Sequence, residues 1–176
     1  MERNGKRIIL VIGGSRSGKS RHALQLSETF SRRAFIATAL PIDDEMKKRI
    51  NTHKKERNNS FLTIEEPYKL GSTIKNLSRE TDVAIIDCLT VWLGNLIYKY
   101  RDPLSQMDEI EAFFSALKDP PCSLILVSNE VGLGIIPADP STRRFRDLAG
   151  SLNQRTAAMA DEVVFTIAGI PLHIKG

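Results

Sequence analysis

The chain has 176 residues, of which 41% are hydrophobic and 26% charged, and its net charge is +4. These values are ordinary for one globular domain over residues 1–176, and they exclude disordered and collagen-like chains. The charge favours anionic ligands but does not by itself indicate nucleic acid. Two cysteines, Cys88 and Cys122, are too few for a disulfide scaffold, so we expect a cytoplasmic protein with reduced thiols. No apolar stretch approaches the ~20 residues of a membrane span, so no membrane insertion is expected.

Apolar runs that alternate with helical patterns predict the fold class. Strands are expected at 7–12, 34–39, 61–64, 83–87, 123–128 and 162–167. Helices are expected at 19–30, 43–57, 67–79, 89–100, 105–118 and 141–160, with a turn at Asp102-Pro103. The alternation predicts an α/β protein whose mostly parallel sheet carries helices on both faces. A last run at 172–175 follows Gly169 and Pro171, and it predicts an antiparallel C-terminal edge.

A phosphate-binding loop follows the first predicted strand. The segment GGSRSGKS matches G-x-x-x-x-G-K-[ST] in full, and it consists of Gly13, Gly14, Ser15, Arg16, Ser17, Gly18, Lys19 and Ser20. Glycines let successive backbone N–H groups turn toward phosphate oxygens, and the following helix directs its positive end at the same anion. Lys19 is expected to reach the β- and γ-phosphates and the Ser20 hydroxyl to ligate Mg²⁺. The motif, placed between a buried strand and a helix, predicts a P-loop nucleotide-binding protein.

A second metal ligand is expected at the end of a neighbouring strand. Asp87 ends the run VAIID, where a carboxylate can hold Mg²⁺ directly or through water. The alternative is an aspartate that only caps the next helix. Asp82 is a poorer candidate because it precedes the strand.

The predicted helix 43–57 is basic and carries one histidine, His53. Met46, Ile50, His53 and Arg57 follow the helical period and so share one face. Neighbouring cations disfavour a protonated imidazole, so we expect His53 to stay neutral and to be able to attack a nucleotide α-phosphate. The alternatives are a solvated basic helix and a structural histidine.

Several longer motifs together resemble one family, the bifunctional adenosylcobinamide kinase/adenosylcobinamide-phosphate guanylyltransferases of cobalamin biosynthesis. The resemblance covers nearly the whole chain. Its motifs are GGSRSGKS at 13–20, IATA at 36–39, DDEMKKRINTHKKER at 43–57, TIEEP at 63–67, IDCLTVWLGNL at 86–96, SNEVGLGIIP at 128–137, RFRDLAGSLNQ at 144–154 and ADEVVFTIAGIPLHIK at 160–175.

The resemblance implies a RecA-like P-loop sheet and two reactions. The first phosphorylates adenosylcobinamide with ATP or GTP, and the second transfers GMP from GTP to that phosphate. His53 stands where the family carries GMP covalently. The implied nucleotide contacts are the phosphate loop with Ala37, Thr38, Ala39, Lys54, Lys55, Glu56, Arg57, Glu65 and Asp87. The resemblance also implies a homo-oligomer, in particular a trimer.

Two other functions compete with this one. A plain small-molecule kinase would share the phosphate loop but would not use His53. A RecA-like ATP-driven nucleic-acid binder would use the basic helix, but aromatic residues are 6% of the chain and no stacking series accompanies the cations, so we expect no nucleic-acid partner. Within the segment 129–134, Glu130 is either a metal-side acid or base or part of a simple glycine loop.

Overall fold

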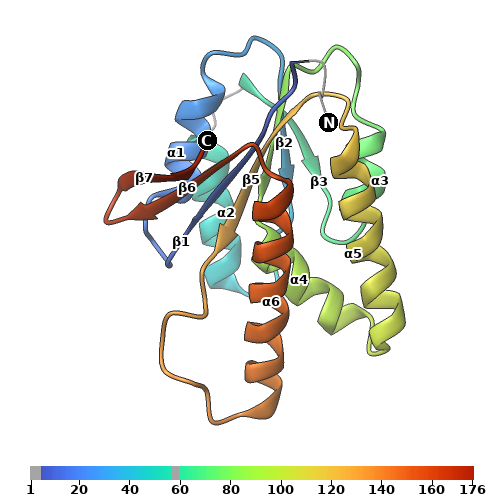
Figure 1. Ribbon diagram of the computed structural model, residues 1–176, viewed down its shortest axis with the longest axis vertical. Coiled ribbons are helices and arrows are strands. Elements are labelled where there is room, and N and C mark those ends of the chain that lie inside the picture. The colour runs from blue at the N-terminus through green and yellow to red at the C-terminus, as the bar shows by residue number, and fades with distance from the viewer. Residues whose placement is uncertain (1–4, 57–59) are drawn as a thin grey trace.

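A seven-stranded sheet in the order β3-β2-β4-β5-β1-β6-β7 forms the centre of the protein (Figure 1). The computed structural model describes residues 5–56 and 60–176. The strands are β1 (Ile8–Gly13), β2 (Arg33–Ala37), β3 (Leu62–Glu65), β4 (Val83–Asp87), β5 (Ser123–Asn129), β6 (Glu162–Ile167) and β7 (Ile170–Lys175). All neighbouring pairs are parallel except β6 and β7, which confirms the predicted parallel sheet with an antiparallel C-terminal edge.

Helices cover both faces of this sheet. They are α1 (Lys19–Ser27), α2 (Asp44–Glu56), α3 (Leu70–Lys75), α4 (Leu89–Lys99), α5 (Pro103–Lys118) and α6 (Pro140–Met159). Successive strand residues point to opposite faces, so β1 feeds two cores. Leu10 belongs to the larger core, under α3 to α6, and Val11 belongs to the smaller core, under α1. In β1 and β5 the even-numbered residues therefore face the larger core and the odd-numbered residues face the smaller core.

Two helices differ from the sequence prediction at their starts. Asp102-Pro103 was expected to be a turn, but Asp102 caps α5 and Pro103 is its first residue. The Asp102 carboxylate accepts the N–H groups of Leu104 and Ser105, and proline fits the first helical position because no N–H is needed there. Asp139 and Pro140 begin α6 in the same way.

The helix predicted at 67–79 is shorter than its pattern. The Glu66 carboxylate accepts hydrogen bonds from the N–H groups of Tyr68 and Lys69, both at 2.8 Å, and these bonds hold the segment before α3 as a turn. The helix therefore begins at Leu70, and it ends at Lys75, before the predicted end at residue 79. No described helix is long and apolar enough to cross a bilayer.

Candidate nucleotide-binding and catalytic site

Three predicted site residues form a row at the carboxyl edge of the sheet. Ala37 ends β2 and pairs in register with Glu65 of β3 on one side and Asp87 of β4 on the other. Since neighbouring strands are about 4.8 Å apart, the two carboxylate-bearing positions are separated by roughly 10 Å. Ligands of parallel α/β sheets bind at this edge, and the phosphate loop leaves β1 there as well.

The phosphate loop holds its lysine against its own backbone. The Lys19 ammonium group donates to the Gly14 carbonyl at 2.5 Å and to the Ser17 hydroxyl at 3.5 Å, and the residue is only 7% exposed. Gly18 precedes α1 with a φ of 95°, a conformation that glycine adopts without steric cost. The loop thus places a buried cation at the positive end of a helix, which suits a phosphate chain.

The C-terminal hairpin supports this loop from the side. The hydroxyls of Ser17 and Thr166 are 2.7 Å apart, and the Gly169 N–H donates to the Ser17 carbonyl at 2.9 Å. A Cβ at Gly13 would lie 2.5 Å from the Thr166 carbonyl oxygen, so only glycine fits beside β6. The antiparallel edge therefore fixes the position of the loop.

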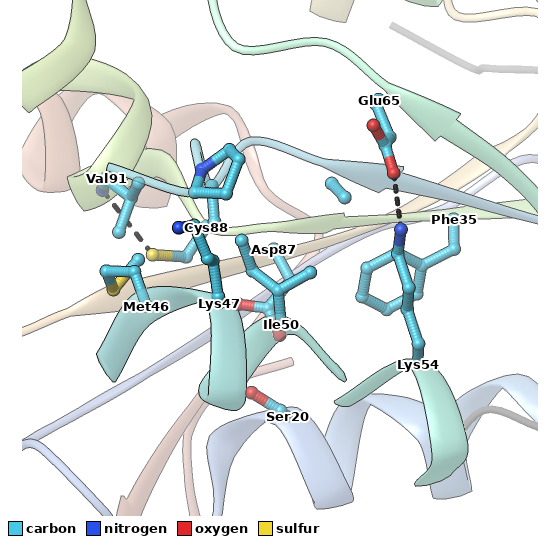
Figure 2. A pocket seen from close by; sticks show the side chains of 13 residues that line it. Ser20, Phe35, Met46, Lys47, Ile50, Lys54, Glu65, Asp87, Cys88 and Val91 are labelled. Carbon is cyan, nitrogen blue, oxygen red and sulfur yellow. Dashed lines mark hydrogen bonds and ion pairs between the residues drawn. The ribbon is translucent and has the colours of Figure 1, made fainter. Parts of the chain in front are cut away.

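A cavity of about 340 Å³ opens between this edge and α2 (Figure 2). Asp87 lies in the middle of the lining side chains and Ser20 at their lower end, whereas Lys54 and Glu65 lie together to one side (Figure 2). Its other lining residues are Phe35, Ala37, Ala39, Pro41, Met46, Lys47, Ile50, Cys88 and Val91. An apolar cavity with separated groups of polar atoms is typical of a small-molecule site.

The oxygen atoms of Ser20 and Asp87 fit Mg²⁺. Both side chains line the same cavity, and both donors are of the hard kind that this cation takes. Among the described residues no group of three or more histidine, cysteine, aspartate or glutamate side chains could hold a metal. Two protein oxygens together with substrate phosphates is the usual arrangement for Mg²⁺ in phosphoryl-transfer sites.

Thr38 holds the turn that carries Asp87. Its hydroxyl donates to the Cys88 carbonyl at 2.9 Å and accepts from the Cys88 N–H at 2.8 Å. The Thr38 N–H also donates to the Asp87 carbonyl at 3.2 Å. Because Thr38 is fully buried, it acts on the site through these bonds, while Ala37 and Ala39 on either side line the cavity.

Cys88 lines the cavity but is not a reactive thiol. Burial, followed by the negative charge of Asp87, raises the pKa of Cys88 to about 12. Its sulfur accepts a hydrogen bond from the Val91 N–H at 3.5 Å and caps α4. The thiol therefore stays protonated at neutral pH and has a structural role.

Helix α2 brings the basic segment to the cavity. Asp43 caps it as predicted, accepting from the Met46 N–H at 2.7 Å. The helical backbone includes His53, Lys55 and Glu56, whose side chains are not described, and Arg57 lies outside the described residues. Lys54 is described, and its ammonium group is 2.7 Å from the Glu65 carboxylate. His53 directly precedes Lys54, three positions after Ile50, so the predicted nucleophile belongs to the helix that walls the cavity.

The apolar lining was not predicted as part of a site. Phe35 and Val91 occupy a strand and a helix that also build the core, so their sequence pattern does not distinguish lining from packing. The spacing of four residues between Met46 and Ile50 did indicate that they share one face of the helix. Glu130 lies apart from the cavity: it lines a groove of about 870 Å³ beside α6, and its carboxylate accepts from the Gly132 N–H. This position supports the glycine-loop alternative.

Known proteins match this chain over nearly its whole length. The family described as cobinamide kinase / cobinamide phosphate guanyltransferase matches residues 9–174. The bifunctional adenosylcobalamin biosynthesis protein CobP of Pseudomonas aeruginosa is 42% identical over 168 residues, which cover 95% of this chain and 96% of that protein. The bifunctional adenosylcobalamin biosynthesis protein CobU of Escherichia coli is 38% identical over 180 aligned positions, covering 96% and 99%.

Among solved structures, the RadB recombinase superimposes with a TM-score of 0.50 and 16% sequence identity, covering 90% of this chain and 73% of that one. At this identity the likeness concerns the fold alone, and it agrees with the predicted RecA-like P-loop sheet.

Proposed function

The chain belongs to the cobinamide kinase / cobinamide phosphate guanyltransferase family, and we propose that it carries out both reactions at the one nucleotide site described above. It is an enzyme of adenosylcobalamin biosynthesis, a kinase and a guanylyltransferase. In the proposed sequence, ATP or GTP phosphorylates adenosylcobinamide, and GMP from a second GTP is then joined to the new phosphate. The observation that carries the proposal is the shared cavity, which has phosphate-side groups at Ser20 and Asp87 and lies under the helix of His53.

The triphosphate binds along the phosphate loop with its base in the cavity. Lys19 and the backbone N–H groups of the loop neutralise the phosphates, and Met46 and Ile50 of α2 pack on the base. The Glu65 carboxylate, an obligate acceptor when ionised, suits the N1–H and 2-amino donors of guanine, which adenine lacks. Glu65 therefore supplies the preference for GTP in the second reaction.

In the phosphorylation step, the chain orients and neutralises the triphosphate. Ser20 and Asp87 would hold Mg²⁺, which would neutralise charge on the phosphate oxygens. The Lys19 ammonium group stabilises the charge that develops as the γ-phosphoryl group leaves the β-phosphate. The acceptor hydroxyl on the aminopropanol arm gains the phosphoryl group, its proton passes to water, and ADP or GDP leaves.

In the guanylyl-transfer step, a neutral imidazole nitrogen of His53 attacks the α-phosphorus of GTP. A phosphorus–nitrogen bond forms, the bond to the β-phosphate oxygen breaks, and pyrophosphate leaves. A phosphate oxygen of adenosylcobinamide phosphate then attacks the same phosphorus. The phosphorus–nitrogen bond breaks, His53 is restored, and the product is adenosylcobinamide-GDP.

Labelled nucleotides test the two reactions separately. The protein is incubated with adenosylcobinamide, Mg²⁺ and either γ-labelled or α-labelled GTP. The corrinoid products are separated by chromatography, and the label and the mass of each product are measured. Label from both positions should reach the corrinoid, the γ-label first. Transfer of the γ-label alone would reduce the function to a plain kinase, and transfer of neither would contradict the proposal.

We further propose that the enzyme acts in the cytoplasm as a homo-oligomer, in particular a trimer. Edge strand β7 exposes Ile170, Leu172 and Ile174, and the segment after β5 exposes Leu133 and Ile135. Uncovered aliphatic side chains along a sheet edge favour association between chains. Light scattering on the purified protein measures the mass, and a monomer at micromolar concentration would contradict the proposal.

A further inference from the structure

Asn129 is the last residue of β5, and side chains of two other elements bind its backbone. The Thr90 hydroxyl accepts the Asn129 N–H at 2.7 Å, and the Asn153 amide donates to the Asn129 carbonyl at 3.1 Å. Both polar groups of the Asn129 backbone are thus bound by side chains of two other elements, α4 and α6.

A buried hydroxyl completes this clamp. Ser128 Oγ donates to Asn153 Oδ1 at 2.6 Å and lies 3.1 Å from Thr90 Oγ1. Thr90, Ser128 and Asn153 are at most 7% exposed. Buried polar side chains are costly unless every one is satisfied, so an interior that only needed packing would be served better by apolar residues.

The strand order places Asn129 between the two halves of the nucleotide site. β5 lies between β1, which leads into the phosphate loop, and β4, which ends at Asp87. Asn129 pairs with Gly13, the first residue of the loop, and Asp87 pairs with Val127. Asn129 therefore lies two residues, about 6–7 Å, beyond Asp87 on the ligand side.

The pleat of β5 determines which face Asn129 occupies. Val127 packs in the core under α1, and Ser128 points to the opposite face, where it meets Asn153 of α6. By alternation Asn129 returns to the α1 face, which it shares with Lys19 and Asp87. Among the residues that the structure describes, its amide group has no hydrogen-bond partner, although the residue is half-buried.

We propose that the Asn129 carboxamide contacts the γ-phosphoryl group during phosphorylation of adenosylcobinamide, and that Thr90, Ser128 and Asn153 are the residues that position it. The inference rests on the proposed function. The amide N–H₂ donates to an equatorial oxygen of the transferring group, on the side away from Lys19. The three residues fix the backbone that carries the amide, so the amide can meet the developing charge with little reorganisation. The guanylyl-transfer step takes place one or two phosphates away and does not use this contact.

The variants Asn129→Ala and Asn129→Asp test the contact in the full-length protein. The aspartate keeps the shape but replaces the donor with a negative charge. We expect kcat for phosphorylation of adenosylcobinamide to fall by about 10²- to 10³-fold, with KM for the nucleotide within about threefold. Labelling of the protein by α-labelled GTP should stay within about threefold of the wild type.

Asn153→Ala tests the positioning role, and Thr156→Val is its control. Thr156 is fully buried on the same helix, but its hydroxyl donates to the Leu152 carbonyl within α6. Asn153→Ala should lower kcat of phosphorylation by roughly tenfold or more at unchanged KM, and it should spare guanylyl labelling. Thr156→Val should leave both reactions unchanged at a comparable thermal unfolding temperature.

Near-normal phosphorylation by Asn129→Asp would overturn the contact. An equal loss of both reactions in Asn129→Ala would also overturn it, because a general structural role predicts that result. If wild-type protein fails to phosphorylate adenosylcobinamide, the proposed function itself is wrong, and the role of Asn129 is rejected with it.

Discussion

Lys54 of α2 and Glu65 of β3 form an ion pair of 2.7 Å at the side of the nucleotide cavity (Figure 2). Their side chains are 47% and 66% exposed, so the pair stabilises the fold by less than about 1 kcal/mol. The pair does, however, keep a carboxylate at the edge of the cavity in line with Ala37 and Asp87. Glu65 can therefore be replaced to test nucleotide recognition with little effect on folding.

Replacing Glu65 should weaken the discrimination between GTP and ATP. Glu65→Gln is expected to lower kcat/KM for GTP in guanylyl transfer by roughly tenfold or more, because an acceptor-only group is replaced by one that also donates. Phosphorylation with ATP should change little. Steady-state kinetics with both nucleotides measures the effect.

Glu111→Gln is the matched control for this variant. Glu111 forms an exposed ion pair of 2.8 Å with Arg155, outside the cavity. Both variants should unfold at nearly the wild-type temperature. An unchanged ratio of GTP to ATP activity in Glu65→Gln would exclude Glu65 from base recognition.

Lys19→Ala should abolish both reactions. The buried ammonium group belongs to the one P-loop motif in the sequence, and both steps need a triphosphate. We expect each kcat to fall at least about 100-fold. Circular dichroism should show an intact fold, and Lys75→Ala, on the surface helix α3, is the control. If folded Lys19→Ala phosphorylated at a near-normal rate, the two reactions would not share this loop.

Asp87→Asn should change the dependence on Mg²⁺ more than nucleotide affinity. An amide oxygen ligates Mg²⁺ less well than a carboxylate, so the Mg²⁺ concentration at half-maximal activity should rise roughly tenfold or more. Asp82→Asn is the control, because Asp82 lies before the same strand and binds Arg32. An unchanged Mg²⁺ midpoint in Asp87→Asn would exclude Asp87 as a metal ligand, and it would leave this position without a capping role as well, because Cys88 caps α4.

Both cysteines should resist alkylation in the folded protein. Burial raises the pKa of Cys88 to about 12 and that of Cys122 to about 11. At pH 8 only about one thiol in 10⁴ and one in 10³ would be ionised, and the thiolate is the reactive form. Mass spectrometry after iodoacetamide treatment should find no adduct at pH 8 and two adducts in guanidinium chloride. Labelling should accelerate as the pH rises. Rapid labelling of the native protein at pH 8 would contradict the structural role of Cys88.

The sequence predicted the strands better than the extent of the helices. Continuous apolar runs marked β1, β4, β5 and β6 because a parallel strand is buried on both faces. The starts of α3 and α5 were missed because side-chain bonds to the backbone determine them. Glu66 and Asp102 make those bonds, and their effect depends on local geometry that periodicity does not contain.

The candidate site shows the same division. Phosphate-side residues such as Lys19 and Asp87 could be predicted from a motif and a strand end. The buried hydrogen bonds of two threonines could not be predicted. Thr38 contacts Cys88, 50 positions away, and Thr90 contacts Ser128, 38 positions away. A single threonine in a helix or strand pattern does not indicate a partner so distant in sequence. Only the register of the sheet brings these groups together.

Replacing His53 should block guanylyl transfer and spare phosphorylation. His53 belongs to α2, next to Lys54 and one turn beyond Ile50 of the cavity wall. In the proposed mechanism its neutral imidazole attacks the α-phosphorus of GTP, and cations of this basic helix would stabilise the departing pyrophosphate. His53→Ala and His53→Asn should therefore take no label from α-labelled GTP yet still phosphorylate adenosylcobinamide. His173→Asn, on edge strand β7, is the control and should label normally.

The stability of the adduct identifies the atom that carries GMP. A phosphorus–nitrogen bond is labile to acid because protonation of the nitrogen makes imidazole a good leaving group, and it is stable to base, unlike an ester on serine or threonine. Label on the wild-type protein should therefore be lost in acid and retained in alkali. Label that survives acid, or that still forms on His53→Ala, would remove this histidine from the mechanism. Because the residues proposed for phosphorylation do not include His53, the chain would then be a plain kinase whose basic helix serves only to bind phosphates.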